Sequence, residues 1–166
     1  MYKHIKVPGN GSCFYHSVVT HLTTPVKLGK LCFSPTVKTL RNLIASILAA
    51  ALKNPNHEYH SLLLHYSDEQ NMSPKKYIVN TKKCMWAGPL EIQILADVLK
   101  KRIQVYNYTE LKKYKHKNGL FDVNCATPLI DFGNKRRKRI TILIKGYKPN
   151  NNQFGVHYDA LVKSEK

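Results

Sequence analysis

The hydrophobic pattern of this chain changes near Arg102, and that change limits the folds available to it. Before Arg102, apolar residues recur at helical spacing, most clearly over 36–53. After Arg102, the segments 103–106, 139–145 and 156–162 are rich in β-branched and aromatic residues, as strands are. Helices followed by strands predict an α+β fold, with helices flanking a mostly antiparallel central sheet of about five strands.

Weaker patterns complete this outline. A short edge strand is expected over 2–7, and the turn-forming residues PGNGS then lead into a helix that begins at or near Cys13. The turn residues at 117–119 predict a hairpin between strands over 112–116 and 120–123. Further helices are expected over 57–66, over 74–79 and from Pro89 to about Leu99, and 23–29 is expected to be a loop.

Length and composition indicate one domain over residues 1–166, expected to be a monomer. Hydrophobic residues make up 43% of the 166, which is enough for a substantial core. The longest apolar run, 43–52, has ten residues, whereas a helix that spans a bilayer needs about 20. The N-terminus has no apolar segment either, so neither a signal peptide nor contact with a membrane is expected, and the predicted location is cytoplasmic.

The cysteines point to reduced thiols. Cys13, Cys32, Cys84 and Cys125 lie far apart and form no C-x-x-C pair, so neither zinc nor another metal is expected. A disulfide framework is not expected in a chain without an export signal. One thiol is therefore free to act as a nucleophile, and the three after Cys13 are expected to be inert core residues.

The charge balance favours acidic partners. The chain has 27 Lys and Arg against 10 Asp and Glu, a net charge of +17, which attracts anions of any kind. The basic residues concentrate in Lys135–Arg139 and in the four lysines between 112 and 117. Such runs fit nuclear import or contact with nucleic acid, so nucleic acid is a secondary candidate partner and a nuclear location is the alternative.

Cys13 is a candidate nucleophile because it follows a glycine-rich turn and starts a helix. A helix N-terminus favours the thiolate, and cysteines in such places have pKa values lowered to about 3.5–7.5. Backbone N–H groups around Gly9, Gly11 and Ser12 would suit the oxyanion of an acyl transfer. The alternative is that Cys13 is a small buried hydrophobic residue.

His157 and Asp159 are a candidate base and its orienting carboxylate. Two residues apart in a strand, they point to the same face, as an imidazole held by a carboxylate requires. The alternative is the solvated polar face of an edge strand. His157 follows Cys13 by 144 positions, and this order and separation recur in papain-like thiol enzymes.

Three motifs in order resemble the OTU (ovarian tumour) cysteine proteases, most of all the compact viral members. They are NGSCFYHSVV, WAGPLEIQILADVLKKRIQVYN and HYDALV. The resemblance implies a papain-like OTU fold in which Cys13 is the nucleophile, His157 the general base and Asp159 the residue that orients it. It also implies hydrolysis of the isopeptide or peptide bond after the C-terminal Gly-Gly of ubiquitin, polyubiquitin or a ubiquitin-like modifier. No metal or organic cofactor takes part in the chemistry of that family.

The resemblance assigns roles to other residues as well. Asn10, Gly11 and Ser12 match the oxyanion loop, with the N–H of Cys13 among its donors. Trp86 and Glu91 match positions that pack the central helix against the sheet. We further expect Tyr158 to wall a narrow channel for a Gly-Gly tail. The body of ubiquitin is expected to dock on the helices between 35 and 79 and on the hairpin over 114–121.

The oxyanion loop departs from the family pattern at two positions. The family usually has Asp where Asn10 stands, and Asn or Asp where Ser12 stands. These departures keep a second hypothesis open, in which the chain is a catalytically weak OTU-like module. Such a module would bind ubiquitin or nucleic acid through its basic surface.

Overall fold

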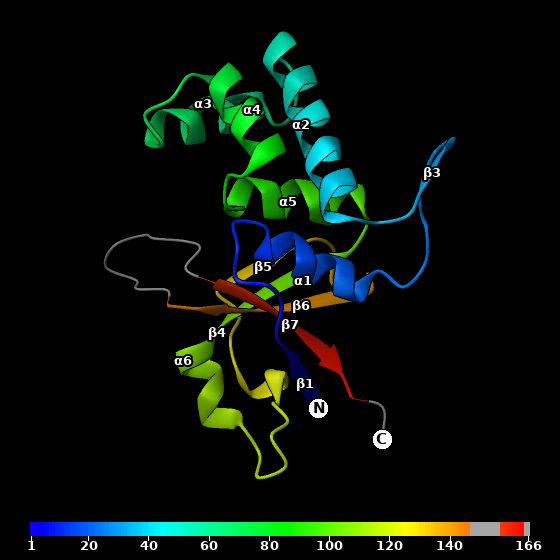
Figure 1. Cartoon of the computed structure of the whole chain (residues 1–166), viewed down its shortest axis with the longest axis vertical. Coiled ribbons are helices and arrows are strands. Elements are labelled where there is room, and N and C mark those ends of the chain that lie inside the picture. The colour runs from blue at the N-terminus through cyan, green and yellow to red at the C-terminus, as the bar shows by residue number, and fades with distance from the viewer. Residues whose placement is uncertain (147–156, 165–166) are drawn as a thin grey trace.

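The chain folds around a five-stranded sheet in the order β1-β7-β6-β4-β5 (Figure 1). The structure is a computed structural model that describes residues 1–146 and 157–164. All strand pairs are antiparallel except β4 with β6, which confirms the predicted α+β fold with a mostly antiparallel sheet. The strands are β1 (Tyr2–Ile5), β4 (Arg102–Asn107), β5 (Ile130–Phe132), β6 (Arg139–Lys145) and β7 (His157–Lys163). Residue 156, the predicted start of β7, lies outside the described residues.

Helices cover one face of the sheet and extend beyond it (Figure 1). The first, α1 (Cys13–His21), packs along β7. The other four long helices gather above it and are α2 (Val37–Lys53), α3 (His60–Glu69), α4 (Pro74–Lys83) and α5 (Pro89–Val98). A capping box between Thr36 and Thr39 begins α2, and the Ser73 side chain caps α4.

Both faces of the sheet are buried, because apolar residues alternate along its central strand. Ile140, Ile142 and Ile144 of β6 face the main core beneath the helices. Leu143 faces a second cluster on the other side, together with Tyr2, Tyr106, Leu111, Phe121, Val123 and Leu161. Within the described residues, no helix is both long and apolar enough to cross a bilayer.

The strands predicted over 112–116 and 120–123 are wrong, although the chain does turn back on itself between them. A short helix α6 (Tyr108–Leu111) and two 3-10 turns, η1 (Lys112–Tyr114) and η2 (Val123–Cys125), occupy this region instead. The pairing is limited to a bridge between Lys115 and Phe121 and two flanking backbone hydrogen bonds, since the run of lysines has no alternating apolar face to bury. The turn itself forms, with Gly119 at φ +81°.

Other differences concern short strands and cysteines. The expected loop over 23–29 contains β2 (Val26–Leu28), which pairs with β3 (Leu31–Phe33) in a separate two-stranded sheet. Strands of three residues, β5 included, are too short to show a period. Cys32, Cys84 and Cys125 are exposed, so the expectation that they are core residues is wrong.

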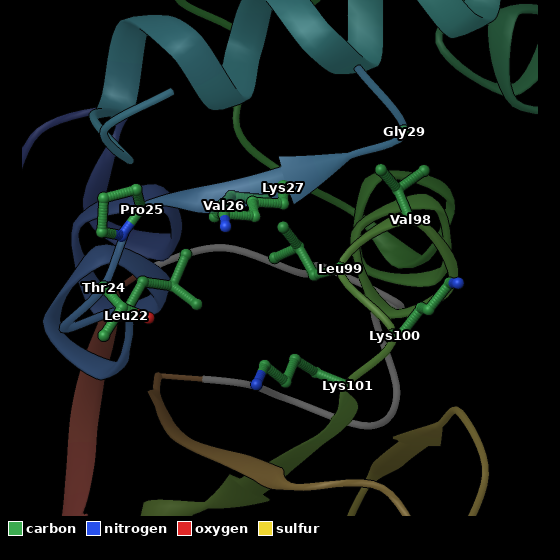
Figure 2. A pocket seen from close by; sticks show the side chains of 10 residues that line it. All are labelled: Leu22, Thr24, Pro25, Val26, Lys27, Gly29, Val98, Leu99, Lys100 and Lys101. Atoms are coloured by element: carbon green, nitrogen blue, oxygen red, sulfur yellow. The ribbon is translucent and has the colours of Figure 1, made fainter. Parts of the chain in front are cut away.

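A cavity of about 410 Å³ lies where β2 approaches the end of α5 (Figure 2).

The core is expected to be sensitive to truncation at α2. Leu48 is fully buried, so Leu48→Ala should lower the free energy of unfolding by about 2–5 kcal/mol through lost contacts and a cavity. Ser46→Ala on the exposed side of the same helix is the control and should change it by less than about 0.5 kcal/mol. Urea unfolding measures both, and equal effects would contradict the assignment of this face to the core.

Candidate active site

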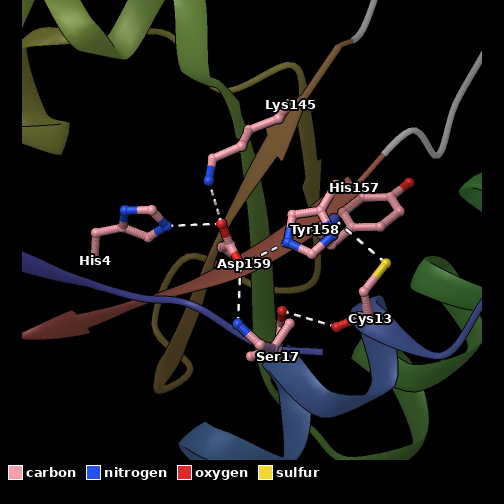
Figure 3. Close-up of polar contacts among 8 residues, drawn as sticks. His4, Cys13, Ser17, Lys145, His157, Tyr158 and Asp159 are labelled. Atoms are coloured by element: carbon pink, nitrogen blue, oxygen red, sulfur yellow. Dashed lines mark hydrogen bonds and ion pairs between the residues drawn. The ribbon is translucent and has the colours of Figure 1, made fainter. Parts of the chain in front are cut away.

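The Cys13 thiol lies at the point where α1 meets the start of β7 (Figure 3). Its Sγ accepts a hydrogen bond from the Tyr158 N–H at 3.4 Å. The residue is only 1% exposed, because its neighbours Phe14 and Val18 anchor α1 in the core. The fold therefore brings Cys13 beside the strand that carries His157 and Asp159, as the sequence predicts.

His157 and Asp159 form a hydrogen-bonded pair on one face of β7. The Nε2 atom of His157 lies 2.8 Å from Oδ1 of Asp159. A carboxylate only accepts hydrogen bonds, so Nε2 carries a proton and Nδ1 is the nitrogen left to act as a base. The Nδ1 edge of the ring faces the loop before Cys13, where a Cβ added to Gly9 would lie 3.6 Å from Nδ1.

Asp159 is a buried carboxylate with four donors. Besides His157, it accepts from His4 Nε2 at 2.7 Å, from Lys145 Nζ at 2.6 Å and from the Val7 N–H at 3.0 Å. Burial alone would raise the pKa of Asp159, but these donors outweigh it and hold the pKa well below its usual range. Asp159 is 0% exposed, so the alternative of a solvated polar face is wrong for this residue.

The sequence did not point to His4 or Lys145 as partners of the site. His4 lies on β1, whose register places it opposite Leu161 of β7, and Lys145 of β6 stands opposite His157. Their roles depend on β7 lying between β1 and β6, and a strand order of this kind leaves no local signal in the sequence.

The predicted oxyanion loop is held by its own asparagine. The Asn10 carbonyl accepts from the Cys13 N–H, and its side-chain Oδ1 accepts from the Ser12 N–H, both at 3.0 Å. The Cys13 amide, an expected oxyanion donor, is thus engaged within the loop. Within the described part of the chain, the N–H groups of Asn10 and Gly11 have no such partner. Gly11 has no room for a side chain, because a Cβ there would lie 2.6 Å from the Cys84 carbonyl oxygen.

A buried arginine supports the same loop from the helical side. Arg41 of α2 is 3% exposed and lies over the Tyr15 ring, 4.3 Å from its centroid. Its Nη2 donates to the Gly11 carbonyl at 2.7 Å and to the Ser12 hydroxyl at 3.1 Å. Nη1 donates to the Thr81 carbonyl at 2.7 Å and to the Met85 carbonyl at 3.0 Å. A charged residue on the apolar face of α2, next to Leu40, was the available sequence signal for this role.

Tyr158 and Trp86 do not occupy the expected places. Tyr158 is 0% exposed, with its hydroxyl donating to the Ala87 carbonyl at 3.2 Å and its ring against Phe14, so it cannot wall an open channel. Trp86 is 40% exposed, so the expectation that it packs a helix against the sheet is wrong. Its ring lies beside Gly11, where an added Cβ would be 3.6 Å from Nε1.

Glu91, by contrast, is buried in a structural position, although its hydrogen bonds reach α4 and the start of its own helix and not the sheet. It is buried and accepts from the Gly88 N–H at 2.8 Å and from the Tyr77 hydroxyl at 2.7 Å, so it caps the start of α5.

The acid–base state of Cys13 differs from expectation. Burial raises the pKa of the Cys13 thiol above its ordinary value, and the Tyr158 amide offsets only part of this rise. The predicted lowering by the helix N-terminus is present, since the amides of Cys13 and Phe14 also lower the pKa of the thiol, but burial outweighs it. A neutral thiol needs a base before it can act as a nucleophile.

A thiol at the start of a helix, next to a strand with a histidine–carboxylate pair, is the arrangement of papain-like cysteine proteases. Within the described residues, no cluster of His, Cys, Asp or Glu could hold a metal ion. The family described as OTU-like cysteine protease matches residues 8–126, and the chain belongs to that family. This match ends before β7. No curated protein sequence matches the chain.

Solved structures of OTU domains share this fold. An OTU domain in complex with ubiquitin is 20% identical with a TM-score of 0.57, and the alignment covers 96% of this chain and 69% of that one. The viral OTU domain protease of Dera Ghazi Khan virus is 17% identical with a TM-score of 0.56, covering 99% and 82%. The Hazara virus OTU bound to ubiquitin is 16% identical with a TM-score of 0.54, covering 96% and 80%.

The Arg41 contacts predict a large effect on stability. Arg41→Met leaves buried carbonyls without donors and should lower the free energy of unfolding by about 2–5 kcal/mol. Arg41→Lys keeps the charge but lacks the planar guanidinium, so its free energy of unfolding should lie between those of Arg41→Met and the wild type. Lys113→Met on the exposed surface is the control, and urea unfolding is the measurement. A fully stable Arg41→Met variant would show that these contacts contribute nothing.

The lowered pKa of Asp159 predicts a stability that depends on acid pH. The pKa of this carboxyl is lower in the folded chain than in the unfolded one. Its contribution to the free energy of unfolding is therefore fully present above the pKa of the unfolded chain, which is near 4. That contribution is lost as the pH falls toward the lower pKa of the folded chain. The urea midpoint of the wild type should therefore drop more steeply between pH 5 and pH 3 than that of Asp159→Asn. An equal pH dependence of the urea midpoint in both proteins would contradict an ionised Asp159 that accepts several hydrogen bonds.

Proposed function

We propose that the chain is a deubiquitinase that hydrolyses the bond after the C-terminal Gly-Gly of ubiquitin or a ubiquitin-like modifier. The observation that carries this proposal is the position of the Cys13 thiol against the Tyr158 amide, beside the His157–Asp159 pair. Membership of the OTU-like cysteine protease family supports the reaction class. Two OTU domains of similar fold were solved with ubiquitin, which supports the substrate.

The mechanism begins with transfer of the Cys13 proton to Nδ1 of His157. The thiolate attacks the carbonyl carbon of the terminal glycine, and the N–H groups of Asn10 and Gly11 are the donors left for the oxyanion. Asp159 stabilises the imidazolium, which then gives its proton to the departing lysine amine. Water, deprotonated by His157, hydrolyses the thioester and restores the thiol.

Exposed apolar side chains suggest where the substrate lies. Trp86, beside Gly11, takes the place of Tyr158 as the candidate wall for a tail without side chains. Leu64 of α3 and Val79 of α4 are large exposed hydrophobic residues within the helical region expected to dock ubiquitin. Tyr114 is exposed in the segment over which the hairpin was predicted, and it supports the second expected contact.

A second candidate function is a catalytically weak module that binds ubiquitin. Two observations favour it: burial raises the pKa of the Cys13 thiol, and the Cys13 amide is engaged by the Asn10 carbonyl. A weak module would bind the same partner without releasing a product.

Covalent capture by ubiquitin with an electrophilic C-terminus separates the two functions. The wild type should form an adduct, Cys13→Ala should form none, and Cys84→Ala, which removes an exposed thiol, should react like the wild type. On a ubiquitin substrate, His157→Ala should abolish turnover, and Asp159→Ala should lower it by a smaller factor. Non-covalent binding of ubiquitin without any wild-type adduct would support the module. The same probe made with ubiquitin-like modifiers measures modifier preference.

A further inference from the structure

Basic residues collect at one end of the central sheet. Arg102 begins β4 and stands directly opposite Arg139, which begins β6. Lys163 ends the antiparallel strand β7 and so lies at this same end. The Arg102 N–H donates to the Lys138 carbonyl, which ties the basic run 135–139 to the start of β4.

The cavity of about 410 Å³ opens beside these residues. Its cationic lining is Lys27 of β2 together with Lys100 and Lys101, which directly precede Arg102. Leu22, Val98 and Leu99 give it an apolar lining (Figure 2). Arg102 and Arg139 alternate with Ile103 and Ile140 of the main core, so their side chains lie on the other face of the sheet. We call Lys27, Lys100, Lys101 and the adjoining run 135–138 the basic surface.

The lysines between 112 and 117 belong to the opposite end of the sheet. They follow α6, which begins where β4 ends, next to Lys145. Lys145 and Arg139 are the two ends of β6, so about 20 Å of strand separates them. The basic surface therefore lies away from Cys13, and the proposed protease mechanism does not use it.

The basic surface is poorly compensated within the chain. Arg102 and Arg139, on the other face, do have partners: Arg102 donates to both carboxylate oxygens of Asp131, and Arg139 donates to Gln104 Oε1. Among the described residues, no carboxylate forms an ion pair with a cation of the basic surface. Cations without carboxylate partners attract anions.

We propose that the basic surface binds the phosphate backbone of single-stranded nucleic acid without reading its sequence. The cavity is lined by lysines together with apolar side chains, and this mixture suits a nucleotide, whose sugar and base are less polar than its phosphates. A membrane is disfavoured, because the large exposed hydrophobic residues lie elsewhere, at Leu64, Val79, Trp86, Tyr114 and Leu129. The net charge of +17, which the proposed protease function leaves unexplained, would raise the rate of association.

Fluorescence anisotropy with a labelled 20-nucleotide RNA of mixed sequence tests the proposal. Affinity should fall as NaCl rises, with a log–log slope of about −0.7 for each phosphate contacted. Lys101→Glu combined with Lys138→Glu should weaken binding at least tenfold and make the slope shallower. Lys75→Glu combined with Lys76→Glu, an equal charge change on exposed residues of α4, is the matched control and should bind nearly as the wild type does.

Three outcomes would overturn the proposal. They are no binding at 150 mM NaCl, an equal loss in the control, and equally tight binding of poly-glutamate or of vesicles with 30% phosphatidylserine. Capture by the ubiquitin probe is measured on the Lys101→Glu, Lys138→Glu variant and should be unchanged. Loss of RNA binding with normal capture of the ubiquitin probe therefore separates this proposal from the protease function, which is tested by Cys13→Ala.

Discussion

The buried carboxylate of Asp159 is the interaction on which the site depends. A carboxylate removed from water must be satisfied by donors, and here they come from β1, β6, β7 and the segment leading to the oxyanion loop. Because Asp159 also holds His157, the same contacts that join the N-terminal and C-terminal strands fix the orientation of the imidazole. One carboxylate therefore both stabilises this edge of the sheet and orients the His157 ring.

Arg41 is the counterpart on the helical side. Its guanidinium joins α2 to the Gly11–Ser12 segment and to carbonyls at the end of α4 and just after it. Cys13 therefore starts its helix between a buried anion that positions His157 and a buried cation that positions the loop. In the proposed mechanism, neither residue touches the substrate, and each acts by fixing the position of another group.

The sequence allowed the long helices and the central strands to be predicted, because each depends on local periodicity. The position of Cys13 beside β7 was predicted from the order of the motifs and from the family resemblance, since no local pattern joins these segments. His4 and Lys145 were out of reach, since their contacts follow from which strands are neighbours. The three-residue strands and the wrongly predicted hairpin strands show the same limit, because short segments have no period of their own. Tyr158 was misplaced because alternation along β7 says nothing about what covers each face. Arg41 was visible as a charge on an apolar face of α2.

The strand order has a consequence for synthesis on the ribosome. β7 lies between β1 and β6, so β1 gains its neighbour in the sheet only after β7 has been made, and until then its described strand contact is the bridge from Tyr2 to Phe121. The Tyr158 amide that contacts the Cys13 thiol follows it by 145 residues. In the proposed mechanism, a nascent chain therefore carries the thiol before the imidazole that serves it has been made.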